Sequence, residues 1–383
     1  MKKAVIVTPF DNYSYEVRIK YVEKYLKNQE YECVVISSDF DHRNKIEYKE
    51  YRSNLELLHV PKYKKNISFT RIYSHYCFAK KVYSRLMEIN PDLIYGSIPP
   101  NFLVKFISKY KKENPDTQLI YEVGDLWPET LPIPNKIKEL INPVLSQWSG
   151  LRNKNLNIAD AVIYECDLFK RHLDKYCSKG LTEIIYLCRE DYYFNKKIEK
   201  NISDVITFAY IGSINNIIDI DVIVELLNQV KIKRKVLFKI IGTGENKDKL
   251  IALCIKNDIP IVDYGIVYDD REKSNILNDC QFAFNIMKDT VVVGATMKSL
   301  EYFHWGLILI NNIPADTAEL VDKYKCGYNI TTPKETAEMI IKNFDESCLE
   351  TMRNSRSVYC KYFSEDVIEK KFNEIFKRLE IKT

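Results

Sequence analysis

The amino-acid sequence predicts an α/β protein made of two doubly wound, Rossmann-like domains that face a central cleft. Three observations lead to this prediction. Short apolar stretches alternate with amphipathic ones, the alternation runs through twice, and a polar stretch over residues 189–203 separates the two runs. Strands that alternate with helices favour parallel sheets, because a parallel crossover needs a helix to return the chain. A length of 383 residues suits two domains, each with its own core.

The first run predicts an N-terminal domain over residues 1–188, with strands over residues 4–7, 33–37, 93–95, 119–123, 161–164 and 184–187 and helices over residues 17–26 and 101–110. The second run predicts a C-terminal domain over residues 189–365, with strands over residues 206–211, 236–241, 261–264, 282–286 and 307–311 and helices over residues 219–229, 247–256 and 297–304. A last amphipathic helix is expected over residues 366–379. In sheets of this kind, ligands bind beyond the carboxyl ends of the strands.

Composition narrows the class of protein. A net charge of +4 is too small an excess to indicate nucleic-acid binding. The apolar start of the chain stops at Phe10 without a cleavage site and is interpreted as a first strand. Ten cysteines lie singly between Cys33 and Cys360, and no two of the five histidines have ligand spacing. Free thiols in a cytoplasmic protein without a bound metal are therefore expected.

The most informative segment lies around the helix expected at residues 297–304. Gly294 and the residue after it let the backbone approach a ligand, and the free N–H groups where the helix begins, around Thr296 and Met297, form an anion site. Lys298 lies in the first turn, where a cation is unfavourable for the helix dipole, so its place indicates a phosphate partner. Glu301 lies one turn further on and can accept both hydroxyls of a ribose. The alternative is an exposed helix with a chance Lys and Glu.

Over nearly its whole length, the sequence resembles glycosyltransferase family 4, whose members are retaining enzymes that use nucleotide sugars. The resemblance is carried by short motifs around strand ends and one helix: Tyr210-Ile211-Gly212-Ser213-Ile214, Gly242-Thr243-Gly244, Asp263-Tyr264-Gly265, Lys298 through Glu301 to Gly306, and Asp125-Leu126-Trp127-Pro128-Glu129. The last motif is similar to one in members that build bacterial surface or capsular polysaccharides.

The resemblance implies a GT-B architecture, in which residues 366–383 pack back on the N-terminal, acceptor-binding domain. It also implies a donor of the uridine-diphosphate type and a glycan or lipid-linked acceptor. No metal or cofactor is required, because the helix dipole and a lysine neutralise the leaving diphosphate. The donor is expected to contact Gly212, Ser213, Gly242, Gly294, Thr296, Met297, Lys298 and Glu301.

Two positions depart from the family pattern. The family often has a second Glu eight residues before the one at Glu301, and this chain has Val293 there. The family also often has an Arg and a Lys after the first strand of the donor domain, where this chain has Ser213, Asn215 and Asn216. Lys298 is expected to replace those cations, with Lys288 as the next candidate.

Asp125 follows a predicted buried strand, at the lip of the expected cleft. In the family this position often holds the polar group that faces the acceptor, which gives Asp125 a role in acceptor binding or proton handling. The other interpretation is an Asp that caps a turn or helix. Elsewhere, Asp219 and Asp221 have the Asp-x-Asp spacing of metal-dependent enzymes, but they open a predicted helix and are interpreted as a cap.

Basic and aromatic residues mix over residues 62–85, which begin with Lys62 and end with Arg85. On a helical wheel, Arg71, His75 and Lys81 cluster with Arg85 beside an apolar side. One interpretation is a helix that lies on the anionic inner face of the membrane, where a lipid-linked acceptor would be found. The simpler interpretation is a core helix with a solvated basic face.

The sequence supports three functions to different degrees. The main hypothesis is retaining transfer of a sugar from a nucleotide donor to a growing bacterial surface or capsular glycan. The missing Glu at Val293 and the missing cations after Gly212 keep open a non-catalytic partner subunit that positions an acceptor for another enzyme. A sugar epimerase of the same architecture is a third hypothesis, but the chain has no paired acids for that chemistry.

Overall fold

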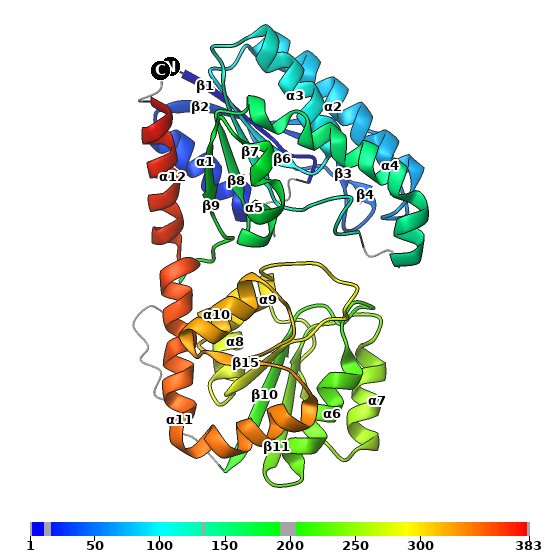
Figure 1. The fold of residues 1–383 in the computed structure, drawn as a ribbon, viewed down its shortest axis with the longest axis vertical. Coiled ribbons are helices and arrows are strands. Elements are labelled where there is room, and N and C mark those ends of the chain that lie inside the picture. Colours follow the sequence, from blue (N-terminus) through cyan, green and yellow to red (C-terminus); the bar gives the residue numbers. More distant parts are fainter. Residues whose placement is uncertain (1, 11–16, 132–134, 192–203, 381–383) are drawn as a thin grey trace. The chain divides into compact units, whose positions relative to one another are not determined.

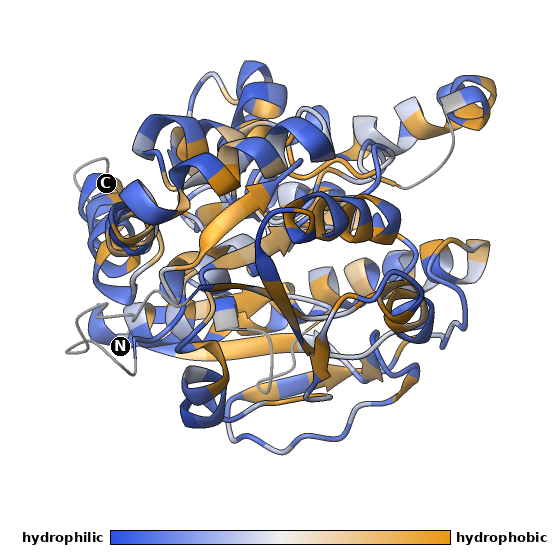
Figure 2. Cartoon of the chain, turned by 90° about the horizontal axis from the view of Figure 1, so that it is seen from below, coloured by the Kyte–Doolittle hydropathy of each residue, from blue (hydrophilic) through white to orange (hydrophobic). Residues whose placement is uncertain are grey.

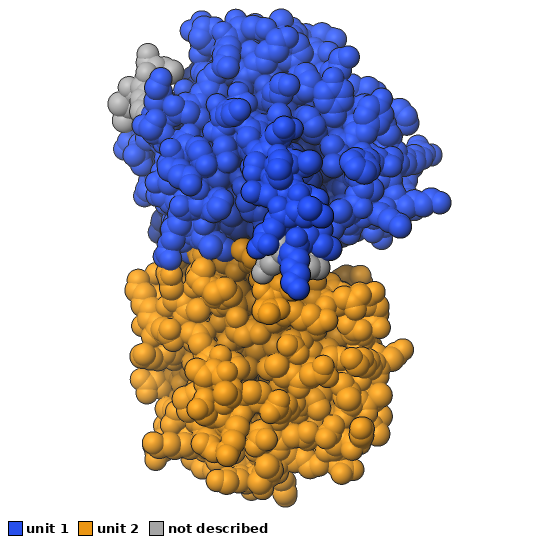
Figure 3. All heavy atoms as spheres, turned by 45° about the vertical axis from the view of Figure 1, so that its right-hand side comes forward, with its two compact units in different colours: residues 1–187, 368–383 blue, residues 188–367 orange. Residues whose placement is uncertain are grey.

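The computed structural model describes residues 2–10, 17–131, 135–191 and 204–380. The chain forms two compact units, which Figure 3 colours separately. The first contains residues 1–187 and 368–383, and the second contains residues 188–367. Each unit contains its own parallel sheet, and each is described by itself below.

In its described residues, the first unit is built on a seven-stranded sheet. Its strands are β1 (Lys2–Val7), β2 (Tyr31–Ser38), β5 (Leu55–Leu58), β6 (Leu93–Ile98), β7 (Gln118–Val123), β8 (Ala161–Tyr164) and β9 (Leu181–Ile184), in the order β5-β2-β1-β6-β7-β8-β9. All of these neighbours pair in parallel. A small antiparallel pair, β3 (Phe40–Asp41) and β4 (Ile46–Glu47), follows β2.

Helices cover both faces of this sheet. One face carries α2 (Phe69–Ile89), α3 (Asn101–Glu113) and α4 (Asn135–Asn153), and the other carries α1 (Val17–Asn28) and α12 (Glu365–Glu380) (Figure 1). A shorter helix, α5 (Asp167–Leu173), follows β8. The last helix is tied down by Phe372, whose ring lies 5.1 Å from that of Tyr25 on α1 and 6.4 Å from that of Tyr95 on β6. Lys371 adds an ion pair of 2.9 Å with Glu183 on β9.

The second unit repeats the plan, with six strands in the part of it that the structure describes. They are β10 (Val205–Ile211), β11 (Lys235–Ile241), β12 (Ile261–Asp263), β13 (Phe282–Asn285), β14 (Ile308–Asn311) and β15 (Gly327–Asn329), all parallel, in the order β12-β11-β10-β13-β14-β15. The helices between and after them are α6 (Ile220–Lys231), α7 (Lys247–Lys256), α8 (Asp270–Leu277), α9 (Met297–His304), α10 (Asp316–Tyr324) and α11 (Pro333–Tyr362).

The hydrophobic pattern explains why these elements form layers. Strand residues are mostly hydrophobic because both faces of a parallel sheet are covered, whereas most helices carry one apolar and one polar side (Figure 2). In the second unit, the rings of Phe208, Phe238 and Phe284 meet between neighbouring strands, with centroids 5.4 Å and 5.6 Å apart. The α/β prediction with two doubly wound domains is confirmed.

One expected strand lies elsewhere. The sequence predicts a strand over residues 184–187, but β9 spans Leu181–Ile184. Its register explains the difference, because Leu181 pairs with Ala161 and Ile184 with Tyr164, so pairing ends where β8 ends. Most of the predicted linker, residues 192–203, lies outside the described part of the chain.

Candidate functional site

In each unit, the strand order indicates where on the sheet a ligand would bind. In both sheets the strand order reverses beside the first strand, between β1 and β6 in one unit and between β10 and β13 in the other. Ligands of open parallel sheets bind at such switch points, beyond the carboxyl ends of the strands. Gly212 follows β10 directly, and the segment from β13 to α9 contains Gly294 and Thr296.

Three glycines allow the turns after β10 and β11 to lie backbone against backbone. Gly212, Gly242 and Gly244 have positive φ angles of 114°, 151° and 147°. A Cβ at Gly242 would lie 2.0 Å from the Gly212 carbonyl oxygen, and one at Gly244 would lie 2.4 Å from that of Ile214. The Gly212 N–H also donates to the Ile241 carbonyl at 2.8 Å. Gly242 therefore has a packing role, and its contact with a donor stays a prediction.

The polar residues that follow Gly212 belong to the same turn. Ser213 is exposed, and its carbonyl accepts a hydrogen bond of 2.8 Å from the Tyr210 hydroxyl. The Asn215 side chain accepts from the Ile217 N–H, and the Asn216 side chain accepts from Asn246. These residues stabilise the turn and supply no cation.

Helix α9 begins with a double cap. The Thr296 hydroxyl accepts from the Ser299 N–H at 2.9 Å, and the Ser299 hydroxyl accepts from the Thr296 N–H at 3.1 Å. Thr296 also donates to Asn285 at the end of β13 at 2.9 Å, so the helix start is fixed to the switch point. The Gly294 carbonyl accepts from both the N–H and the hydroxyl of Thr317. The N–H groups of Met297 and Lys298 precede the first residue that has a helical acceptor, so they can receive an anion.

Lys298 lies across the Gly212 turn. Its Cε is 3.3 Å from the point where a Cβ at Gly212 would stand, and its Nζ is 5.3 Å from the centroid of the Tyr210 ring. No carboxylate pairs with its ammonium in the described part of the chain. Burial lowers the pKa of Lys298 to about 8. The structure thus brings Gly212 and Lys298 together, and no counter-ion for this largely buried cation comes from the residues that the structure describes.

Glu301 is held by partners that sequence patterns did not indicate. Its Oε2 pairs with Arg189, and its Oε1 accepts from the Trp305 indole at 3.0 Å and lies 3.8 Å from the Lys273 ammonium. Arg189 also pairs with Asp270. The Glu301 side chain is 12% exposed, so it combines a fixed orientation with some access from solvent. Arg189 and Lys273 are far from Glu301 in the sequence, so only the fold brings them together.

Lys288 lies apart from this arrangement. It is exposed and lines a hollow of about 670 Å³ that also includes Asp219 and Asp221 but not Lys298. Asp219 accepts from the Val222 N–H at 3.3 Å and Asp221 lies in the first turn of α6, so the cap interpretation holds. Within the described ranges, no three His, Cys, Asp or Glu side chains form a potential metal site.

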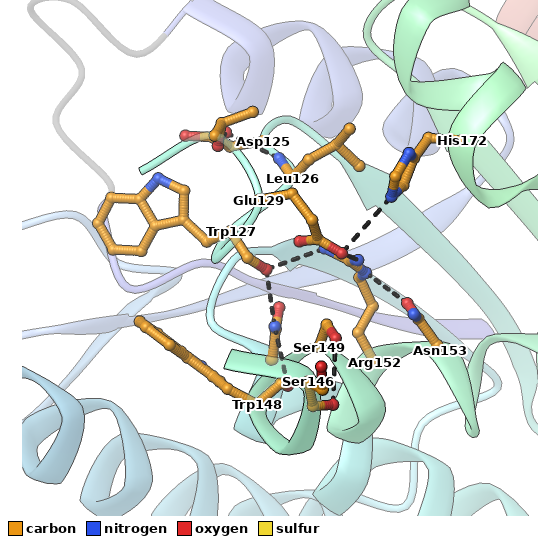
Figure 4. Close-up of polar contacts among 12 residues, drawn as sticks. Asp125, Leu126, Trp127, Glu129, Ser146, Trp148, Ser149, Arg152, Asn153 and His172 are labelled. Carbon is orange, nitrogen blue, oxygen red and sulfur yellow. Dashed lines mark hydrogen bonds and ion pairs between the residues drawn. The ribbon is translucent and has the colours of Figure 1, made fainter. Parts of the chain in front are cut away.

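In the first unit, Asp125 follows β7. Its Oδ1 accepts from the Leu126 N–H at 2.7 Å and from the Thr130 hydroxyl, as a turn cap does (Figure 4). Burial raises the pKa of Asp125. The structure therefore shows the capping contacts, and the acceptor role of Asp125 stays a prediction.

The turn after Asp125 is anchored by a buried arginine (Figure 4). Arg152 on α4 is fully buried; it donates to the Trp127 carbonyl at 2.9 Å and pairs with Glu129 at 2.6 Å. Asn101 at the start of α3 donates to the same carbonyl at 2.8 Å. Burial acts to raise the pKa of Glu129, but His172 and Arg152 outweigh it and lower that pKa. These contacts fix the Trp127 backbone at the carboxyl end of β7.

Of the basic cluster predicted over residues 62–85, Arg71 and His75 are buried, whereas Lys62 and Lys81 are exposed, and the membrane contact of this segment stays a prediction. Arg71 and His75 are each 4% exposed, on the side of α2 that packs into the unit with Phe78. The Arg71 guanidinium lies 3.9 Å from the centroid of the Trp127 ring, which favours burial of the cation. Arg85 pairs with Glu56 and with Glu88. The wheel misplaced the buried side because two of its members are charged.

The chain was also compared with known proteins. No protein-family model and no curated protein matches it. Solved structures do match it over both units. Sucrose-phosphate synthase from Thermosynechococcus elongatus is 10% identical, with full coverage of both chains and a TM-score of 0.68. Anabaena HepE in complex with UDP is 13% identical, with 99% of this chain and 100% of that one covered and a TM-score of 0.70.

A third match is the lipopolysaccharide outer core galactosyltransferase WaaB, which is 12% identical over 99% of each chain with a TM-score of 0.67. At these identities the likeness is one of fold. The chain therefore has the GT-B fold, two Rossmann-like domains joined in one polypeptide. None of the helices in the described ranges is long and apolar enough to span a bilayer.

Proposed function

We propose that the chain is a glycosyltransferase that takes a sugar from a nucleotide-sugar donor. The observation that carries the proposal is Lys298, a largely buried ammonium without a carboxylate partner among the described residues, at the start of α9 and over the Gly212 turn. A switch point, free helical N–H groups and a desolvated cation together suit a diphosphate. The GT-B fold supports the same class of enzyme.

The donor in this proposal is a uridine-diphosphate sugar. Structures of Anabaena HepE contain UDP and UDP-glucose, which supports that choice for a chain of the same fold. Gly212, Lys298 and the α9 N–H groups would hold the diphosphate, and Glu301 would hold the ribose. No metal is needed in this scheme, because the helix dipole and Lys298 stabilise the negative charge that grows on the leaving diphosphate.

The acceptor in this proposal is a growing bacterial surface or capsular glycan, linked to a lipid, and the sugar is transferred with retention. The family 4 resemblance supports retention, and a match to a lipopolysaccharide galactosyltransferase supports a surface glycan. Asp125 would contact the acceptor from the turn after β7. The ten cysteines are all free thiols, which supports a cytoplasmic setting.

A non-catalytic partner subunit is the second candidate. Its support is Glu301, whose two oxygens already contact Arg189, Lys273 and Trp305 and so have little capacity left for a ribose. Val293, where the family often has a Glu, adds to this support. A subunit of this kind would position an acceptor and would not bind a nucleotide.

Calorimetric titration with UDP, GDP and CDP separates the two candidates. We expect UDP to bind, and we expect Lys298→Met to weaken it by about tenfold or more, because a charge-assisted phosphate contact is lost. Lys288→Met removes an exposed lysine from the hollow that Asp219 also lines, and it is the matched control. Absence of binding by any of the three nucleotides would favour the partner subunit, and equal losses in the two variants would refute the role of Lys298.

A further inference from the structure

Helix α4 of the first unit presents an unusual apolar surface. Ile137, Leu140 and Val144 are 49%, 82% and 65% exposed, and their spacing of three and four residues places them on one side of the helix. From Lys136 to Gln147, none of the α4 residues is buried in the described structure. Single exposed aliphatic residues are common, but a continuous stripe indicates a surface that another body covers.

The stripe continues onto the start of α2. Trp148 lies one turn beyond Val144 on α4, and it lines a small hollow together with Ile67, just before α2 begins. Ile67 is itself exposed, as is Phe69 at the first position of α2. The apolar surface therefore involves two helices. We call it the apolar stripe, made of Ile67, Phe69, Ile137, Leu140 and Val144.

A groove whose charged lining residues are all lysines, as far as the chain is described, lies beside the stripe on the same helix. It has a volume of about 610 Å³ and lies between α3 and α4, with Lys105, Lys109, Lys112 and Lys154 around it and Phe106 among its apolar residues. None of the described residues that line it is acidic. Lys109 lies 3.8 Å from Glu113, whereas the other three lysines have no ion-pair partner within the described part of the chain. We call this feature the lysine groove.

We propose that α4 docks the protein on an anionic phospholipid bilayer, with the apolar stripe among the acyl chains and the lysine groove on lipid phosphates. Aliphatic and aromatic residues on one side of a helix, next to lysines, suit the interfacial region of such a bilayer. A second copy of the chain fits less well, because a symmetric contact through α4 would bring two lysine grooves close together. The inference rests on this surface alone and does not require the proposed sugar transfer.

Vesicle flotation of the full chain tests this surface. The wild type is expected to float with vesicles of phosphatidylglycerol and phosphatidylcholine, and not with phosphatidylcholine alone. Replacing Lys105, Lys112 and Lys154 together by Gln is expected to weaken binding by about a hundredfold, since each lysine near an anionic surface contributes on the order of tenfold at most. Leu140→Ser with Val144→Ser is expected to weaken it by about tenfold or more.

Matched controls come from exposed residues of the second unit. One control variant changes three exposed lysines together to Gln, namely Lys233, Lys249 and Lys256. The other changes two exposed aliphatic residues, Ile232→Ser with Ile255→Ser. Both controls should bind vesicles like the wild type. Circular dichroism spectra of all variants, compared with that of the wild type, check that each variant is folded before its binding is compared. The proposal fails if the wild type does not float with anionic vesicles, or if the control variants lose as much binding as the α4 variants. It also fails if light scattering shows a dimer that Leu140→Ser with Val144→Ser disrupts while vesicle binding is unchanged.

Discussion

Burial of the Lys298 ammonium is expected to lower the stability of the folded protein. An ammonium in a largely buried place without a carboxylate costs free energy, and the lowered pKa of about 8 reports that cost. We expect Lys298→Met to stabilise the ligand-free protein, with a rise in Tm of roughly 2–4 °C if about 1 kcal/mol is recovered in a domain of this size. A fall in Tm in scanning calorimetry would show that the ammonium has a stabilising partner.

The lowered pKa of Lys298 makes the stability of the native state depend on pH. Between about pH 8 and 10.5 the unfolded chain keeps the Lys298 proton and the native state has released it, so native stability rises with pH across this window. The Tm difference between Lys298→Met and the wild type should therefore shrink as pH rises through it. The affinity for UDP should instead fall as pH rises above 8, because the diphosphate favours the charged form of Lys298. Titrations at pH 7 and pH 9 measure this.

Replacing the glycines in the turns after β10, β11 and β12 by Ala should destabilise the protein to different degrees. Gly242→Ala would place a Cβ 2.0 Å from a backbone oxygen, and we expect it to destabilise the protein by about 3 kcal/mol. Gly212→Ala meets the flexible end of Lys298 at 3.3 Å, so we expect roughly 1–2 kcal/mol together with weaker UDP binding. Gly265→Ala has open space and a positive φ only, and it is the control that measures the backbone strain alone. Urea unfolding ranks the three.

At the scale of elements, α9 is, with α7, one of two helices whose bounds the sequence predicted at both ends. Its bounds match the expectation, because Thr296 caps its start and Gly306 follows its end with a φ of 62°. Helix α4 was not predicted, since its first half has no buried side and contains Pro143, so it lacks the periodicity that reveals a helix. Helix α11 was also missed.

Contiguous motifs were found more readily than partners from different elements. Gly212, Lys298 and Glu301 lie in short motifs whose chemistry is visible in the sequence. Arg189 and Lys273, which hold Glu301, come from the segment between β9 and β10 and from α8. The buried Arg152 behind the Trp127 turn likewise has no signal, because an arginine on a helix usually indicates an exposed side.

The Glu301 network gives a prediction that separates ribose binding from structure. If Glu301 holds the ribose, Glu301→Gln should weaken UDP by about tenfold and leave inorganic diphosphate binding unchanged, because diphosphate contacts only the Lys298 end of α9. If Glu301 serves only to pair with Arg189 and Lys273, both ligands should lose affinity equally or not at all. Lys273→Met is the companion variant, since it removes a partner of Glu301 and keeps the carboxylate. Calorimetric titration with the two ligands decides between these outcomes.

For the whole molecule, the sequence predicted the class and the repetition of the α/β plan, because strand and helix periodicity are local properties. It could not predict which side of α2 is buried, since Arg71 is stabilised by Trp127, a residue far along the chain. The first unit is discontinuous: it begins the chain and takes back residues 368–383 at its end. The stability of the first unit therefore depends on both ends of the chain, and that of the second unit depends on residues 188–367.

A calorimetric experiment tests this division. Phe372 is fully buried beside Tyr25 and Tyr95 in the first unit, and Phe344 is 1% exposed in the core of the second. Truncation of a buried Phe to Ala costs about 3–5 kcal/mol, and a chain of two domains can show two transitions. Phe372→Ala should lower the transition of the first unit alone, and Phe344→Ala that of the second. UDP should raise only the transition that Phe344→Ala lowers, because ligand binding stabilises the unit that holds it. If each variant lowered both transitions equally, the two units would unfold as one cooperative body, and the assignment of the nucleotide to the second unit would need another test.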